Sequence, residues 1–277
     1  MKNSALKNVI WAMSIIVCLI AVIVGLLIAS VNRYNGSGFD KEVDLHMKNS
    51  SASGVVQLTA GDMPDGASLK SLGETADAGM EYIDKLTFLC DSSVIGMRDY
   101  GLLSGGKDTY QVWGTNSGTL KISEITSTAI KYPSDGSLIS VADSAMIAKP
   151  PILVICVGQD GLAGSDENNF KTNYTMLINS IMSGSPDTQI ICCSISSVTE
   201  NYTGPDGLTA ELIRSANKWI EEVCMSTGVY YCNAAHSVDN GYGYVHATFL
   251  STNGKTLNST GISEFISYLR THALGGI

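Results

Sequence analysis

Ser92 stands at a place in the sequence where a serine can act as a nucleophile. The apolar run LTFLC covers 86–90, and Asp91 and Ser92 follow it directly. A serine after a buried strand has its hydroxyl at the strand's carboxyl edge, and an N–H near a following helix N-terminus stabilises negative charge. This is therefore a favourable place for a nucleophile. The alternative is that Asp91 and Ser92 only cap the next helix, and the local sequence leaves both interpretations open.

The elements that must position Ser92 are short, continuous apolar runs separated by helical periods. Continuous runs of this length are typical of strands buried on both faces, as in a parallel sheet. The runs are 86–90, 110–114, 151–158, 188–195 and 228–232. Two helix faces lie between runs, and their members are Phe170, Tyr174, Leu177, Ile178 and Ile181, then Leu212, Ile213, Ala216, Ile220 and Val223. Such alternation predicts right-handed crossovers, with ligands at the carboxyl ends of the strands.

The last two hundred residues resemble the SGNH, or GDSL-type, hydrolase family. That family's first strand ends in Gly-Asp-Ser with the serine as nucleophile, and this chain has Cys90-Asp91-Ser92, followed by the similar YGLL at 100–103. Gly118, in VWGTNSGTL, resembles the glycine that supplies an oxyanion-hole N–H, and NYTMLINSIMSGSPDTQIICCSI resembles a helix and strand of the family. The resemblance implies an α/β three-layer sandwich with a parallel, flavodoxin-like sheet, and an oxyanion hole formed by Ser92, Gly118 and a third residue.

Three family positions depart from the pattern. The family's Asp-Gly-x-His-Leu-Asn aligns with NGKTLN at 253–258, which puts Asn253 and Thr256 at the catalytic Asp and His positions. Asp160, in VGQDG, takes the place of the oxyanion-hole asparagine. A serine attacks an acyl carbon usefully only when a base takes its proton, and Thr256 is no base. An ionised Asp160 would also put negative charge beside the developing oxyanion.

Two features of the sequence could compensate for these departures and restore acyl transfer at Ser92. His246 lies on the approach to the same loop as a substitute base, with the alternative that it is a partly exposed loop histidine, and His236 is a weaker candidate. A protonated Asp160 would donate a hydrogen bond as asparagine does if burial raised its pKa. An efficient esterase requires both, so we expect an impaired enzyme.

The N-terminus predicts a membrane anchor. Lys2 and Lys7 precede an uncharged apolar run from Val9 to Val31, which as a helix crosses a hydrocarbon core of roughly 30 Å. The alternative is a cleaved signal peptide, whose apolar region is usually shorter. Lysines on the short side place that side in the cytoplasm and the remainder outside. We therefore expect a tail and transmembrane helix over 1–31, a Ser- and Gly-rich linker over 32–77, and the SGNH-like domain over 78–277.

The net charge and the cysteines bear on which partners, disulfides and metal sites the chain can have. A net charge of −9 argues against nucleic acid, which requires clustered Lys and Arg. We expect Cys90, Cys156, Cys192 and Cys193 to be buried thiols, whereas Cys224 and Cys232 flank a turn and are a candidate disulfide. No Cys/His spacing matches a zinc site, and no cofactor is implied.

Two functions remain after these observations. The first is a membrane-anchored, extracytoplasmic pseudoenzyme that binds a cell-surface ligand such as an acylated glycan or cell-wall fragment. The second is an active acyl-esterase or O-deacetylase of the cell envelope with Ser92 as nucleophile. The missing Asp-x-x-His favours the first, and the family resemblance favours the second.

Overall fold

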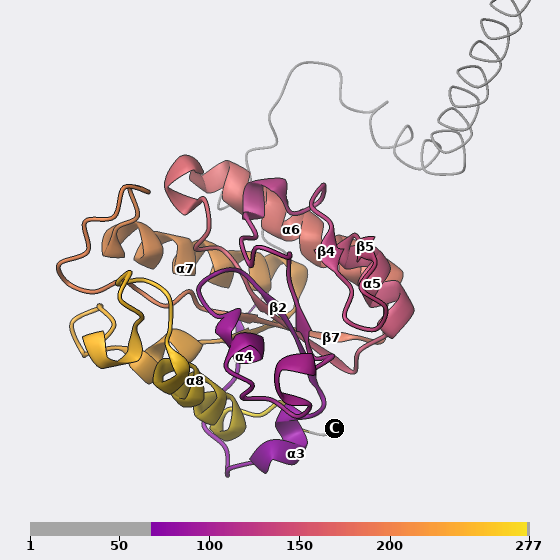
Figure 1. The fold of residues 1–277 in the computed structure, drawn as a ribbon. Coiled ribbons are helices and arrows are strands. Elements are labelled where there is room, and N and C mark those ends of the chain that lie inside the picture. Colours follow the sequence, from indigo (N-terminus) through magenta and orange to yellow (C-terminus); the bar gives the residue numbers. More distant parts are fainter. Residues whose placement is uncertain (1–67, 276–277) are drawn as a thin grey trace, which may run out of the picture. The chain divides into compact units, whose positions relative to one another are not determined.

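The computed structural model describes residues 68–275, which form a parallel sheet between two layers of helices (Figure 1). The main sheet has six strands in the order β1-β8-β7-β6-β2-β3, and every pairing within it is parallel. Its strands are β1 (Lys70–Ser71), β2 (Leu86–Cys90), β3 (Val112–Trp113), β6 (Ile152–Cys156), β7 (Gln189–Cys193) and β8 (Tyr230–Cys232). The expected α/β sandwich with a parallel sheet is confirmed.

The helices divide between the two faces of the sheet. One face packs against α5 (Val141–Ala148), α6 (Glu167–Gly184) and α7 (Ala210–Thr227). The other face packs against α3 (Gly79–Ile83), α4 (Gly96–Asp99) and α8 (Ser259–Thr271). The short pair β4 (Ile130–Lys131) and β5 (Leu138–Ile139) forms a separate antiparallel hairpin. Short 3-10 turns lie at 106–108, 122–124, 162–164, 234–238 and 247–249.

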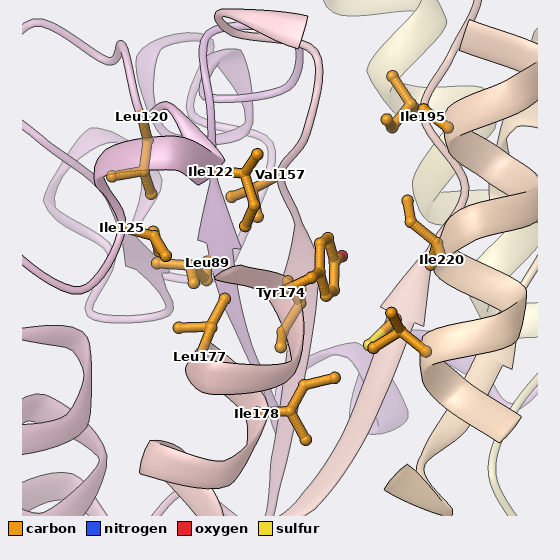
Figure 2. Packing of buried hydrophobic residues seen from close by; sticks show 14 of the residues in the cluster. Leu89, Leu120, Ile122, Ile125, Val157, Tyr174, Leu177, Ile178, Ile195 and Ile220 are labelled. Atoms are coloured by element: carbon orange, nitrogen blue, oxygen red, sulfur yellow. The ribbon is translucent and has the colours of Figure 1, made fainter. Parts of the chain in front are cut away.

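The helix faces read from the sequence are the faces that form the core. Tyr174, Leu177 and Ile178 of α6 and Ile220 of α7 lie in one packed cluster with Leu89 of the sheet (Figure 2). Removing large aliphatic and aromatic side chains from water is the main source of stability in such a cluster. This packing holds the strand ends, and therefore the loops that follow them, in fixed register.

The domain begins earlier than the sequence predicts. Lys70 and Ser71, inside the predicted linker 32–77, pair in parallel with Tyr230 and Tyr231 of β8. The run that forms β1 is two residues long and polar, so hydrophobic patterning gives no signal for it. A strand of the sheet therefore lies ahead of the predicted boundary at residue 78.

The described helices include none that is both long and apolar enough to cross a membrane. The predicted anchor at 1–31, the linker as far as residue 67 and Cys18 lie outside the described residues. All six cysteines of the described part are free and buried. The buried-thiol prediction is confirmed, and the candidate disulfide between Cys224 and Cys232 is wrong: Cys224 faces the α6 and α7 side of the sheet and Cys232 the α8 side.

Candidate active site

Ser92 and Asp160 meet at the carboxyl ends of two adjacent strands. Ser92 follows β2 and Asp160 lies four residues after β6, and these strands pair in parallel from Leu86 to Cys90. The chain runs outward from β2 to β3 on one side and through β6, β7 and β8 on the other. This change of direction is where open α/β sheets place their ligands.

The Ser92 hydroxyl donates a hydrogen bond to the Asp160 carboxylate. Ser92 Oγ lies 2.5 Å from Asp160 Oδ1, and the Ser92 N–H donates to Asp160 Oδ2 at 3.0 Å. The N–H of Leu120 donates to the same Oδ2 at 2.9 Å. Asp160 is 8% exposed, so three donors converge on a carboxylate that is largely shielded from water.

Leu120, and not Gly118, supplies the second backbone donor. The Gly118 N–H is used within its own turn, where it donates to the Thr115 carbonyl at 3.2 Å. Gly118 has a φ of 79°, a conformation that glycine adopts without strain, and this turn delivers Leu120 to the site. The Leu120 side chain is fully buried near Ile125 and Leu89 (Figure 2). Gly118 is therefore a turn residue here, and sequence reasoning missed Leu120 because a backbone donor leaves no signal in the residue type.

Asp91 is a buried anchor for the same loops. Its carboxylate accepts hydrogen bonds from the N–H groups of Gly158 and Gln159, each at 2.9 Å, and from the N–H and hydroxyl of Ser93. Asp91 therefore joins the loop after β2 to the loop after β6 and does not cap a helix with its side chain. Burial, together with the nearby charge of Asp160, raises the pKa of Asp91 to about 6.

The loop at 251–257 lies beside this centre, but Asn253 and Thr256 bring no acid or base to it. The Leu257 N–H donates to the Ser93 carbonyl at 3.0 Å, and Gln159 Nε2 donates to the Lys255 carbonyl at 3.2 Å. Asn253 and Thr256, at the predicted Asp and His positions, bond to each other: Asn253 Nδ2 donates to Thr256 Oγ1 at 2.9 Å. The Thr256 N–H also donates to Asn253 Oδ1 at 3.0 Å. Their polar atoms therefore stabilise their own turn.

Neither histidine proposed as a substitute base hydrogen-bonds Ser92. His246 is exposed, and its Nδ1 lies 2.7 Å from Thr248 Oγ1 in its own turn. His236 is also exposed, and its ring lies against Tyr268 at a centroid separation of 6.4 Å. Among residues 68–275 the remaining histidine is His272, which stacks on Tyr268.

Lys255 is the cation of the predicted catalytic loop, and it is held by an acid. Its Nζ lies 2.7 Å from Asp206 Oδ2, and Asp206 also accepts from the Tyr202 hydroxyl at 2.9 Å. Burial favours a neutral amine, but the hydrogen bond that Lys255 donates to Asp206, together with the negative charge of Asp206, outweighs burial and raises the pKa of Lys255. A serine base of the lysine type needs a lowered pKa, so Lys255 is a structural cation.

The described residues contain no group of three or more His, Cys, Asp or Glu arranged to hold a metal ion. The polar centre is therefore made of Ser92, Asp160 and backbone N–H groups. A carboxylate that accepts from the two N–H groups occupies the donors that would otherwise stabilise an oxyanion.

No protein-family model matches the sequence, and no curated protein matches it. Solved structures resemble it in fold. A family 3 carbohydrate esterase from Clostridium thermocellum has 16% identity and a TM-score of 0.45 over 68% of this chain and 93% of that one. A GDSL-like lipase from Bacteroides thetaiotaomicron has 13% identity and a TM-score of 0.46 over 69% of this chain and 86% of that one. Because these similarities concern the fold alone, the chemistry of the site depends on its own side chains and hydrogen bonds.

Proposed function

We propose that this chain is a membrane-anchored, extracytoplasmic SGNH-type protein whose site is catalytically impaired and whose role is binding. The observation that carries the proposal is Asp160, whose carboxylate accepts from the N–H groups of Ser92 and Leu120. The role proposed is a binding or assembly module for a cell-surface ligand of the acylated-glycan or cell-wall type.

Acyl transfer at Ser92 meets two obstacles. An oxyanion formed at the acyl carbon would have to displace the Asp160 carboxylate from the two N–H groups, and each lost donor is worth about 3–4 kcal/mol of transition-state stabilisation. The loop that should supply a base presents Asn253 and Thr256, which bond to each other. Without a base the serine keeps its proton and remains a weak nucleophile.

One observation favours the alternative, an active serine acyl-esterase or O-deacetylase. Ser92 Oγ lies 2.5 Å from Asp160 Oδ1, so a carboxylate is within reach of the serine proton and is the candidate base. In that alternative Asp160 would have to leave the N–H groups as the oxyanion forms. The two functions therefore differ in what Asp160→Asn does.

The deciding experiment measures covalent labelling of the purified protein by a fluorophosphonate probe, together with hydrolysis of small acyl esters. We expect the probe to label the wild-type protein no more than it labels Ser92→Ala. We also expect no ester hydrolysis in the wild type that Asp160→Asn reduces. Ser263→Ala, which changes an exposed serine of α8, is the matched control. Brisk turnover that Ser92→Ala and Asp160→Asn both abolish would establish the esterase instead.

A further inference from the structure

A groove of about 500 Å³ opens beside the β3 edge of the sheet, and its lining is cationic. Arg98 comes from α4, Lys107 from the turn that follows it and Lys131 from β4, so three separate segments bring positive charge to one concavity. Asp108 is the acidic residue of the lining. We call this the cationic groove.

Two of its cations have no carboxylate partner in the part of the chain that the structure describes. Arg98 pairs with its sequence neighbour Asp99 at 2.9 Å, but Lys107 and Lys131 form none of the ion pairs found within residues 68–275. Like charges that line one concavity raise its positive potential and attract an anion. In a chain with a net charge of −9, such a local excess of unpaired cations is a feature to explain.

An exposed aromatic side chain is shared by the cationic groove and a second groove. Tyr110 is 68% exposed and, with Pro133, lines both the cationic groove and a neighbouring groove of about 620 Å³. Tyr132 and Trp113 line the second groove. An aromatic ring presents an apolar face, and a tyrosine ring also has a polar hydroxyl at its tip. The second groove therefore suits a ring-shaped ligand that carries hydroxyl groups.

We propose that the two grooves together bind an acidic oligosaccharide, with a uronic-acid carboxylate held by Lys107, Lys131 and Arg98 and sugar rings lying against Tyr110 and Tyr132. Pockets of about 300–1,000 Å³ each accommodate a ligand of small-molecule size, so two neighbouring grooves that share Tyr110 and Pro133 suit a short oligomer. Ser92 and Asp160 line neither groove. The inference therefore does not depend on whether Ser92 is active.

The test measures binding of trigalacturonate to the protein by calorimetry, with maltotriose as the uncharged ligand of equal length. We expect trigalacturonate to bind, maltotriose to bind about tenfold or more weakly, and added salt to weaken the acidic ligand because exposed charges are screened. Lys107→Gln and Lys131→Gln should each weaken trigalacturonate binding by about twofold to fivefold. Tyr110→Ala should weaken both ligands.

Lys218→Gln is the matched control, because it removes an exposed lysine of α7 that lines neither groove. Unchanged melting temperatures will show that the variants are folded. Inorganic phosphate is the second probe: if it binds as tightly as trigalacturonate, the saccharide part is wrong. Absence of trigalacturonate binding, equal binding of maltotriose, or unchanged binding in the Lys107→Gln, Lys131→Gln double variant would overturn the proposal.

Discussion

The Asp91 carboxyl is fully buried, and its ionisation is linked to folding. Burial and the charge of Asp160 raise its pKa from 3.8 to about 6. The folded state therefore binds a proton more tightly than the unfolded state, so the stability that this group contributes is complete below its unfolded pKa and is lost as pH rises through about 6. Asp91 makes the protein more stable in mild acid.

We expect the free energy of unfolding of the wild type to be larger at about pH 5 than at about pH 7.5, with a contribution from Asp91 of about 1 kcal/mol. Urea unfolding at the two pH values measures it. Asp91→Asn should reduce that difference while lowering stability at both values, because an amide whose oxygen accepts from the Gly158 and Gln159 N–H groups turns its own NH2 group toward the Ser93 N–H, which then loses its acceptor. An identical pH difference in the variant would contradict the assignment.

Asp160, Asn253 and Thr256 are the residues whose reversal should restore chemistry. Asp160→Asn removes the charge from the Ser92 and Leu120 N–H groups and adds an N–H donor, while Asn253→Asp and Thr256→His supply an acid and a base. One oxyanion donor is worth about a hundredfold to a thousandfold in rate, and its effect depends on the presence of a base. The triple variant should therefore hydrolyse esters faster than Asp160→Asn alone and faster than the Asn253→Asp, Thr256→His double variant.

Ser92→Ala in the triple background should abolish that activity, and unfolding curves must show that the triple variant is folded. The Leu257 N–H, which donates to the Ser93 carbonyl, ties the loop to the strand end and is unchanged by the substitutions. A folded triple variant without Ser92-dependent turnover would show that residue 256 does not reach the serine.

At the scale of elements, the segment before residue 78 is part of the domain. Beyond the pairing of β1 with β8, the Thr75 N–H donates to the Thr271 carbonyl at 2.6 Å and the Ala78 N–H to the Arg270 carbonyl at 2.9 Å. Asp77 also pairs with Arg270. These contacts tie the segment both to the edge of the sheet and to the end of α8.

A chain that starts at Ala78 should therefore be less stable than one that starts at Ser68. Each backbone hydrogen bond contributes roughly 0.5–1.5 kcal/mol, so we expect a loss of about 1–3 kcal/mol in the free energy of unfolding. Urea unfolding of the two proteins side by side measures it. Coincident curves would show that the segment 68–77 contributes nothing to the stability of the domain.

Element prediction succeeded where burial dictates residue type. The buried strands and the faces of α6 and α7 could be read from apolar periodicity, because one residue class must recur at a fixed period. β1 could not, since its pairing uses backbone groups of the polar residues Lys70 and Ser71.

The same distinction holds in the site. Ser92 and Asp160 were predicted together because side chains carry their roles, and the structure places them in contact. The second N–H donor at the centre was assigned to Gly118 and belongs to Leu120, because a backbone donor depends on the path of the turn and not on the residue. Lys255 and Asp206 pair across 49 positions of the chain, a distance at which a single sequence gives no register.

For the whole molecule, the orientation that the proposed N-terminal anchor would take across a membrane determines which ligands the grooves and the Ser92 site would meet. Lys2 and Lys7 lie on the short side of the apolar run 9–31, and Arg33, Lys41 and Lys48 lie on the other side. Lysines on the short N-terminal side place that side in the cytoplasm. We therefore expect protease added to intact cells to degrade the domain and spare an N-terminal tag.

Lys2→Glu with Lys7→Glu should reduce the fraction of molecules in this orientation. Lys218→Gln is the control, because it removes a positive charge far from the apolar run. Protection of the wild-type domain until the cells are lysed would place the domain in the cytoplasm, where a cell-surface glycan would not be its ligand.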